Sequence, residues 1–155
     1  MSSRSPEAGL PRAAWELLLR RAAGGPVRVE ARGTSMLPFA RAGDSFTIAP
    51  TPSPRVGDIL LFEHRGALTV HRLVRITSAG YLLKGDANAH PDGLFPLEAL
   101  LGRAVALHRA GCPDRDLTRR RERLLARSLA LASLGAHRLR RASSAARTLL
   151  EWLRA

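Results

Sequence analysis

The chain has 155 residues, of which 45% are apolar and 5% aromatic, so it is long enough for one domain with a mainly aliphatic core. The formal net charge is +12, and Lys84 is the only lysine among 25 basic residues. An excess of this size favours a polyanionic partner, either an anionic lipid surface or nucleic acid. The single cysteine, Cys112, excludes an intrachain disulfide, and no residue pattern indicates a metal site.

Residues 1–26 are expected to form a tail with one short amphipathic helix, at 13–23, which Gly24-Gly25-Pro26 ends. Apolar and polar residues alternate from Val27, a pattern that predicts a strand. Further strands are expected at 45–49, 58–64, 68–76, 81–84 and 103–109, separated by short loops containing Gly, Pro or Asp. Short strands with no long helix between them predict a mainly β fold, a compact antiparallel domain over residues 27–113.

Residues 114–155 contain no proline and are rich in Arg, Leu and Ala, so they are expected to form one or two helices, broken near Gly135. Eleven arginines stand against four acidic residues there. We expect this basic tail to contact an anionic membrane surface, as interfacial helices do, and packing on the β domain is the alternative. No stretch reaches the ~20 apolar residues that cross a bilayer, and no secretory pattern opens the chain. A cytoplasmic or peripherally membrane-bound protein is therefore expected.

The first candidate for chemistry is Ser35, in the turn Gly33-Thr34-Ser35-Met36-Leu37-Pro38. A serine in a tight turn after a strand can expose its hydroxyl, and the turn can aim backbone N–H groups at a developing oxyanion. His71 lies inside an apolar strand, where a histidine is more often a hydrogen-bonded core residue than a base. The loop that begins Lys84-Gly85-Asp86 usually caps itself through its aspartates. Each feature by itself therefore has a purely structural explanation.

In chain order, however, G-x-S-M-x-P, GD, GD-I-L-x-F, H-R, KGD-x-N and GR-x-V resemble the type I signal peptidase family over about residues 27–107. The closest branch is that of the endoplasmic reticulum, archaea and some Gram-positive bacteria, in which histidine replaces the lysine base. The resemblance implies an all-β fold shared with LexA-like repressor peptidases. It also implies Ser35 as nucleophile, His71 as general base and Asp92 as the carboxylate that assists it.

Two further assignments follow from this resemblance. Asp86 matches an earlier aspartate of the family, and we expect it to support the loop. Gly33 stands where many signal peptidases have a serine that helps the oxyanion hole, so the backbone N–H groups of Thr34 and Ser35 are expected to form it. The chemistry is consistent with these roles, because a serine hydroxyl needs a base within hydrogen-bond reach and the base needs a carboxylate to fix its tautomer.

The expected function is thus a serine endopeptidase that forms an acyl-enzyme, uses no cofactor, and cuts a signal or leader peptide or a dedicated precursor after small residues. The absence of the family's membrane anchor favours a dedicated precursor. One alternative is a LexA-like regulator that cleaves itself. Ala23-Gly24 resembles a self-cleavage bond, but no helix-turn-helix precedes the β domain and only ten residues separate Gly24 from Ser35. The other alternative is an inactive module that binds membrane or nucleic acid. The joint presence of Ser35, His71 and Asp92 argues against an inactive module, so nucleic acid is not the expected partner.

Overall fold

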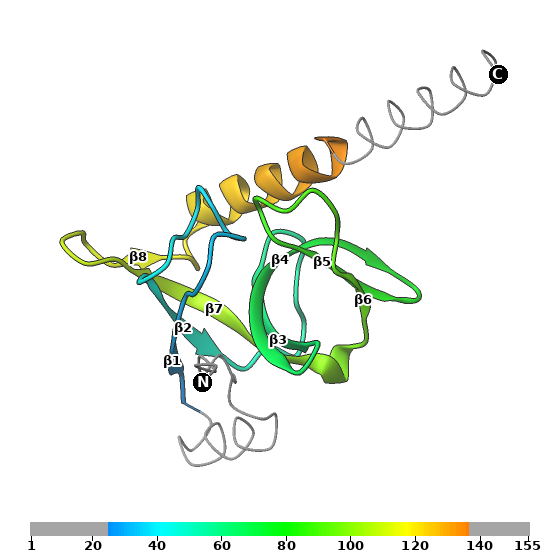
Figure 1. Ribbon diagram of the computed structural model, residues 1–155, viewed down its shortest axis with the longest axis horizontal. Helices are drawn as coiled ribbons and strands as arrows, with labels where there is room; N and C mark the ends of the chain where they lie inside the picture. The colour runs from blue at the N-terminus through cyan, green and yellow to red at the C-terminus, as the bar shows by residue number, and fades with distance from the viewer. Residues whose placement is uncertain (1–24, 137–155) are drawn as a thin grey trace, which may run out of the picture.

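The computed structural model describes residues 25–136, in which eight strands form one antiparallel sheet that curls around itself (Figure 1). In chain order the elements are β1 (Val27–Glu30), β2 (Ser45–Ala49), β3 (Ile59–His64), β4 (Ala67–Thr77), β5 (Gly80–Lys84), β6 (Gly93–Phe95), the 3-10 helix η1 (Leu97–Ala99), β7 (Leu100–His108) and β8 (Arg115–Asp116). The spatial order is β1-β2-β7-β3-β4-β5-β6, and β8 pairs with β7. The predicted mainly β fold is confirmed, and β6 and β8 are the strands that the sequence pattern missed.

Strand β3 lies at the centre of the sheet and is buried on both faces from Ile59 to Phe62. Successive side chains of a strand point to opposite faces. Ile59 and Leu61 accordingly join the core cluster of Phe46 and Ile48, whereas Leu60 and Phe62 join a second cluster on the other face. This explains why the segment is a continuous apolar run without alternation, and it makes β3 a rigid support for the neighbouring strands.

The turn between β3 and β4 sets the register of β4. Arg65 and Gly66 have φ angles of 52° and 78°, and two consecutive positive φ values are typical of the two-residue hairpin turn that matches strand twist. Pairing then runs from His64 opposite Ala67 to Leu60 opposite His71. The hairpin therefore fixes the position of His71 relative to the core.

A helix over residues 120–136 lies across the β domain (Figure 1). Its Ala130 is fully buried. It passes so close to the turn before β3 that a Cβ atom on Gly57 would lie 2.7 Å from the Arg127 backbone nitrogen. This part of the basic tail therefore packs on the β domain.

The helix continues through Gly135 to at least Ala136, so the predicted break does not lie at Gly135. One exposed glycine costs a helix only about 1 kcal/mol, which the packing of the preceding turns outweighs. The helix predicted at 13–23 lies outside the described residues, and the membrane contact of the tail stays a prediction. Among residues 25–136, no helix combines the length and apolarity that crossing a bilayer would need.

Candidate active site

Ser35 lies in a turn over residues 33–39, between β1 and β2, which we call the serine turn. Two backbone hydrogen bonds join the segments before and after this turn. They run from Ala31 N to the Asp44 carbonyl (2.7 Å) and from Gly43 N to the Ala31 carbonyl (3.1 Å). The next residue, Met36, is buried in the core. The Ser35 carbonyl accepts a 2.8 Å hydrogen bond from Ala87 N. The backbone of Ser35 is thus held on both sides.

The hydroxyl of Ser35 meets His71, which projects from the middle of β4. Ser35 Oγ and His71 Nε2 are 2.9 Å apart, a distance at which the imidazole can accept the hydroxyl proton. The imidazole is buried, and the Phe62 ring packs beside it with the ring centroids 6.0 Å apart. Neighbouring backbone and core residues therefore fix the imidazole in front of the serine.

Asp92 completes the arrangement from the loop of residues 85–92, which connects β5 to β6. Its Oδ2 atom lies 2.6 Å from His71 Nδ1, and its own N–H donates to the Leu83 carbonyl at 2.9 Å. When Nδ1 carries the proton that Asp92 accepts, Nε2 is left with its lone pair toward Ser35. The structure therefore brings together Ser35, His71 and Asp92, the three residues to which the family resemblance assigned the chemistry.

The comparisons with known proteins identify the family of this domain. The model of the Peptidase S24-like family matches residues 13–105. The chain belongs to this family. The match covers three fifths of the chain, includes Ser35, His71 and Asp92, and assigns a serine-type peptidase with the β fold of the LexA and signal peptidase superfamily. A search of curated proteins found no match.

Two amide groups of the serine turn of this S24-like domain are candidates for the oxyanion hole. Within the described residues, neither the Thr34 nor the Ser35 N–H donates a hydrogen bond to another protein group, and Thr34 is exposed. Gly33 adopts a φ of 74° and contributes no side chain. The assignment of the two N–H groups to an oxyanion hole stays a prediction. No group of three or more His, Cys, Asp or Glu that could hold a metal ion occurs in the described residues.

The opposite face of β4 carries a buried ion pair. Arg72 donates to both Asp86 oxygens, from Nε at 2.7 Å and from Nη2 at 2.6 Å, and from Nη1 to the Gly57 carbonyl at 3.0 Å. A bidentate pair of this kind holds its partners in one geometry. The Cζ atoms of Arg72 and Arg115 lie 4.8 and 4.9 Å from the centroid of the Phe39 ring. Asp86 thus ties the 85–92 loop to β4.

Lys84 lies on this same face. It pairs with Arg72 across β4 and β5, and directly paired residues point to one face of a sheet. Its Nζ atom donates to Ser133 Oγ of the 120–136 helix at 2.6 Å and to the Gly85 carbonyl at 3.3 Å. The only lysine of the chain therefore faces away from the His71 side of β4.

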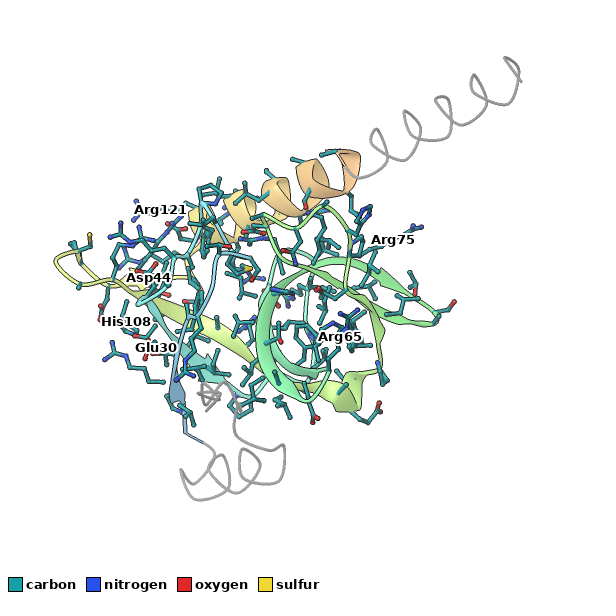
Figure 2. All side chains as sticks on the ribbon, viewed as in Figure 1. Glu30, Asp44, Arg65, Arg75, His108 and Arg121 are labelled. Carbon is teal, nitrogen blue, oxygen red and sulfur yellow. The ribbon has the colours of Figure 1, made fainter. Side chains whose placement is uncertain are left out.

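Asp44, the second residue of the Gly-Asp motif after the serine turn, also has a structural partner. Arg109 donates to it from Nε at 3.0 Å and from Nη2 at 2.6 Å, and the Arg41 N–H adds a bond at 3.0 Å. Hydrogen bonding by Arg109 lowers the pKa of the Asp44 carboxyl, with Arg41 contributing and burial opposing. Figure 2 shows Asp44 in the part of the molecule where β1, β2 and β7 lie together. No sequence pattern indicated Arg109, which comes 65 residues later.

A cleft of about 640 Å³ opens beside Ser35, and we call it the catalytic cleft. Its walls combine apolar side chains with basic residues near β1. The apolar ones include Val29, Ala31, Met36, Ala40, Phe46, Leu68 and Val70, and the charged ones include Arg28, Glu30, Arg32 and Arg41. A cleft of this size and lining can take an extended peptide segment with small apolar side chains. Sequence reasoning missed these wall residues, because alternation marks a strand but not what its edge faces.

Proposed function

We propose that the chain is a serine endopeptidase of the signal-peptidase type with a histidine base, and that it removes a leader or signal peptide from a dedicated precursor. The observation that carries the proposal is the continuous hydrogen-bonded series from Ser35 Oγ through both His71 nitrogens to Asp92, at 2.9 and 2.6 Å. Hydrogen bonds of this length from nucleophile to base, and from base to carboxylate, are what acyl transfer by a serine requires.

In the first half of the reaction His71 Nε2 takes the Ser35 proton while Oγ attacks the scissile carbonyl carbon. The carbonyl oxygen gains negative charge, which the Thr34 and Ser35 N–H groups stabilise. The imidazolium is stabilised by Asp92, which accepts from Nδ1 and stays ionised. His71 then gives its proton to the departing amine, the C–N bond breaks, and the new N-terminus leaves as the acyl-enzyme remains.

In the second half a water molecule replaces the amine. His71 takes one water proton as the oxygen attacks the acyl carbon, and it returns that proton to Ser35 Oγ when the ester bond breaks. The product acid leaves, and serine and neutral histidine are regenerated. Every proton removed in one step is returned in the next, so the cycle needs no cofactor.

Cleavage is proposed to follow small residues, alanine above all, since the family resemblance implies this preference and apolar side chains line the cleft next to Ser35. Incubation of the full chain with a peptide library, followed by mass spectrometry, tests the function and the preference together. The Ser35→Ala chain is the matched control. Cuts by both chains would disprove the peptidase assignment, and cuts mainly after arginine or large aromatic residues would disprove only the preference.

The second candidate is LexA-like self-cleavage, which the S24-like family membership favours. β1 and the residues after it, from Arg28 to Gly33, line the catalytic cleft, and Ala23-Gly24 precedes β1 by only a few residues. The test follows the mass of the purified chain with time, again beside Ser35→Ala. A first-order loss of the N-terminal segment, independent of protein concentration, would establish self-cleavage, whereas an intact chain that cuts added peptides would establish the endopeptidase.

A further inference from the structure

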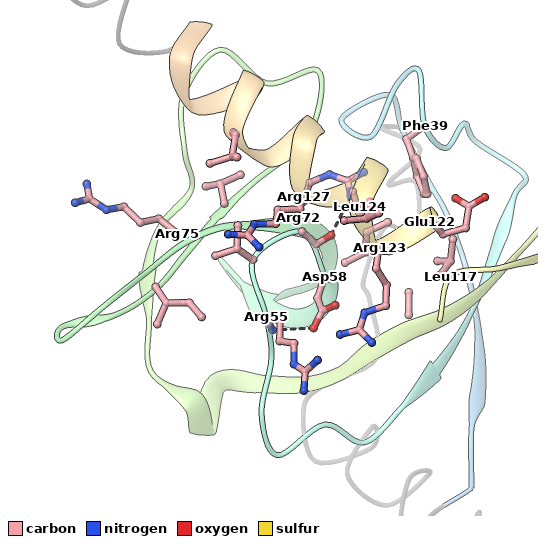
Figure 3. Close-up of a pocket in the computed structure, with 18 of the residues that line it drawn as sticks. Phe39, Arg55, Asp58, Arg72, Arg75, Leu117, Glu122, Arg123, Leu124 and Arg127 are labelled. Atoms are coloured by element: carbon pink, nitrogen blue, oxygen red, sulfur yellow. Dashed lines mark hydrogen bonds between the residues drawn. The ribbon is translucent and has the colours of Figure 1, made fainter. Parts of the chain in front are cut away.

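A second pocket, of about 1000 Å³, lies between the 120–136 helix and the sheet (Figure 3). It shares no lining residue with the catalytic cleft. The proposed peptidase reaction therefore leaves this pocket unused. Its volume lies at the upper end of the range of small-molecule sites, about 300–1,000 Å³.

The walls of the pocket are largely aliphatic. The sheet and the turn before β3 supply Val56, Ile59, Val74 and Ile76, and the opposite side supplies Leu117, Leu124, Leu131 and Leu134. Leu124 and Leu131 are each 58% exposed, and Ile76 is 46% exposed. Leu124 and Leu131 are seven residues apart along the helix and thus lie on one helix face. A bound apolar chain would remove this surface from water.

The pocket also has an excess of positive charge. Its lining contains six arginines and two acidic residues. Arg72 is paired with Asp86, and Glu122 is paired with Arg115 at 2.6 Å. Figure 3 shows the side chains of Arg55 and Arg123 near that of Asp58, with Arg75 pointing away from this group.

At this end of the pocket guanidinium groups outnumber carboxylates. Asp58 accepts a hydrogen bond from the Arg55 backbone N–H and lies 3.6 Å from Arg103 Nη1. Within residues 25–136, neither Arg55 nor Arg123 forms a salt bridge through its guanidinium. Asp58 thus has Arg103 as its ion-pair partner, while the guanidinium groups of Arg55 and Arg123, which line the same pocket, have no such partner among residues 25–136. This end of the pocket therefore favours a second anion.

The walls offer little to the main chain of a peptide. β3 is paired on both sides, by β7 and β4, and β4 is paired by β3 and β5. Neither of these two described strands therefore offers a free edge to the pocket. Amides buried without partners cost free energy, and extended peptides bind by adding to open edges. A ligand with polar atoms at one end only matches the walls better.

We propose that this pocket binds a single-chain anionic amphiphile, whose carboxylate or phosphate headgroup pairs with Arg55 and Arg123 and whose alkyl chain packs along Leu124, Leu131 and Ile76. This binding is independent of the proposed peptidase function, because the two sites share no residue. Arg72 also lines the pocket and binds Asp86 of the 85–92 loop, so the ligand would contact the support of that loop.

Calorimetric titration of the full chain with twelve-carbon probes below their micelle concentrations tests the proposal. Dodecanoate should bind with one-to-one stoichiometry and at least tenfold more tightly than dodecyltrimethylammonium, which has the same chain and the opposite charge. Inorganic phosphate, a headgroup without a chain, should bind at least tenfold more weakly than dodecanoate. The Ser35→Ala chain should give the same affinities, which separates this result from the fate of the peptidase proposal.

Variants locate the site. The double variant Arg55→Gln/Arg123→Gln should weaken dodecanoate at least tenfold, and Leu131→Gln, at an exposed position, several-fold. Arg121→Gln is the matched control, since Arg121 is an exposed arginine of the same helix outside the pocket, and it should leave the affinity unchanged. Absence of saturable binding to the folded chain would overturn the proposal. An equal loss in Arg121→Gln, or binding to anionic phosphatidylglycerol vesicles alone, would overturn it in favour of a general surface attraction.

Discussion

The two faces of β4 differ at two adjacent residues. His71 faces the catalytic cleft and joins Ser35 to Asp92, whereas Arg72 faces the other way and joins Asp86 to the Gly57 carbonyl. The two aspartates, Asp86 and Asp92, come from one loop and are six residues apart. Under the proposed mechanism this loop has two separable tasks, because Asp92 would orient the base whereas Asp86 ties the loop to the sheet.

The Arg72 face stabilises the site by geometry more than by net energy. A buried ion pair recovers little beyond the cost of desolvating two charges, but breaking it leaves one charge uncompensated and costs about 3–5 kcal/mol. The Arg72 side chain is fully buried and that of Asp86 is 10% exposed. Substitutions on the two faces should therefore fail differently, one in chemistry and the other in folding.

The largest effect is expected for the residues that exchange the proton. Ser35→Ala removes the attacking oxygen and His71→Ala removes its base, so each should reduce kcat/KM toward the uncatalysed background, because residues that act as a unit fail together. The free energy of unfolding should change little, because neither residue belongs to the face of β4 that carries the Arg72–Asp86 ion pair. Peptide cleavage assays beside urea unfolding would measure both.

Lys84→Met is the control for this first pair. Lys84 contacts Ser133 and the Gly85 carbonyl, so its removal should change turnover less than tenfold. A folded but inactive Lys84→Met chain, together with an active His71→Ala chain, would contradict the histidine base and support a serine–lysine pair.

Asp92→Asn is expected to have the next largest effect on activity. The amide nitrogen of an asparagine would favour the wrong tautomer of His71, with the proton on Nε2, and in a comparable triad this change lowers kcat by about 10⁴-fold. The KM should stay close to that of the unchanged chain. A loss confined to KM would indicate that Asp92 contacts substrate and does not orient the base.

Asp86→Asn should act on folding instead. It leaves Arg72 buried without its countercharge, and we expect the free energy of unfolding to fall by about 3–5 kcal/mol. The double variant Arg72→Met/Asp86→Asn removes both charges and should recover part of that loss. Activity per folded molecule should fall less than in Asp92→Asn. Equal chemical defects in the two aspartate variants, with unchanged stability, would refute the division of tasks between the two faces.

Sequence reasoning singled out His71 on one face of β4 but none of the contacts that Arg72 makes on the other face. Ser35, His71 and Asp92 were found together because their motifs keep a fixed order along the chain. The strands were found because alternation and short Gly or Pro loops mark them locally. The missed strands β6 and β8 have three and two residues, too few for any period to be visible.

The supporting contacts could not be predicted, because they join residues that are far apart in the chain. Arg109 reaches Asp44 across 65 positions, and Lys84 reaches Ser133 across 49. Nothing in the arginine-rich composition distinguishes Arg109 from its many exposed neighbours. The pocket under the 120–136 helix could not be predicted either, because it depends on how closely that helix approaches Gly57, which is far from it in the chain.

Gly57→Ala tests how tightly the 120–136 helix packs on the turn whose carbonyl accepts a hydrogen bond from Arg72. Gly57 has a φ of 100°, and an added Cβ would lie 2.7 Å from Arg127 N. Backbone strain and displacement of the helix together should lower the free energy of unfolding by about 2–4 kcal/mol. Gly111→Ala is the matched control: its φ is 74° but no atom lies within 4 Å, so only strain of about 1–2 kcal/mol applies. Equal losses would mean that the helix does not press on Gly57.

The smallest expected effect concerns acid stability near the serine turn. Because Arg109 lowers the pKa of the folded-state Asp44 carboxyl, the unfolded chain takes up this proton at a higher pH, near the ordinary value of about 3.9. The stabilisation is therefore fully present well above that pH and is lost as the pH falls from there through the folded-state pKa. At pH 7 Asp44→Asn should be less stable than the unchanged chain, and the difference should narrow in acid, as urea unfolding at a series of pH values would show. A difference in the free energy of unfolding that stayed constant down to pH 3 would mean that packing of Asp44, and not its charge, stabilises the segments that flank the serine turn.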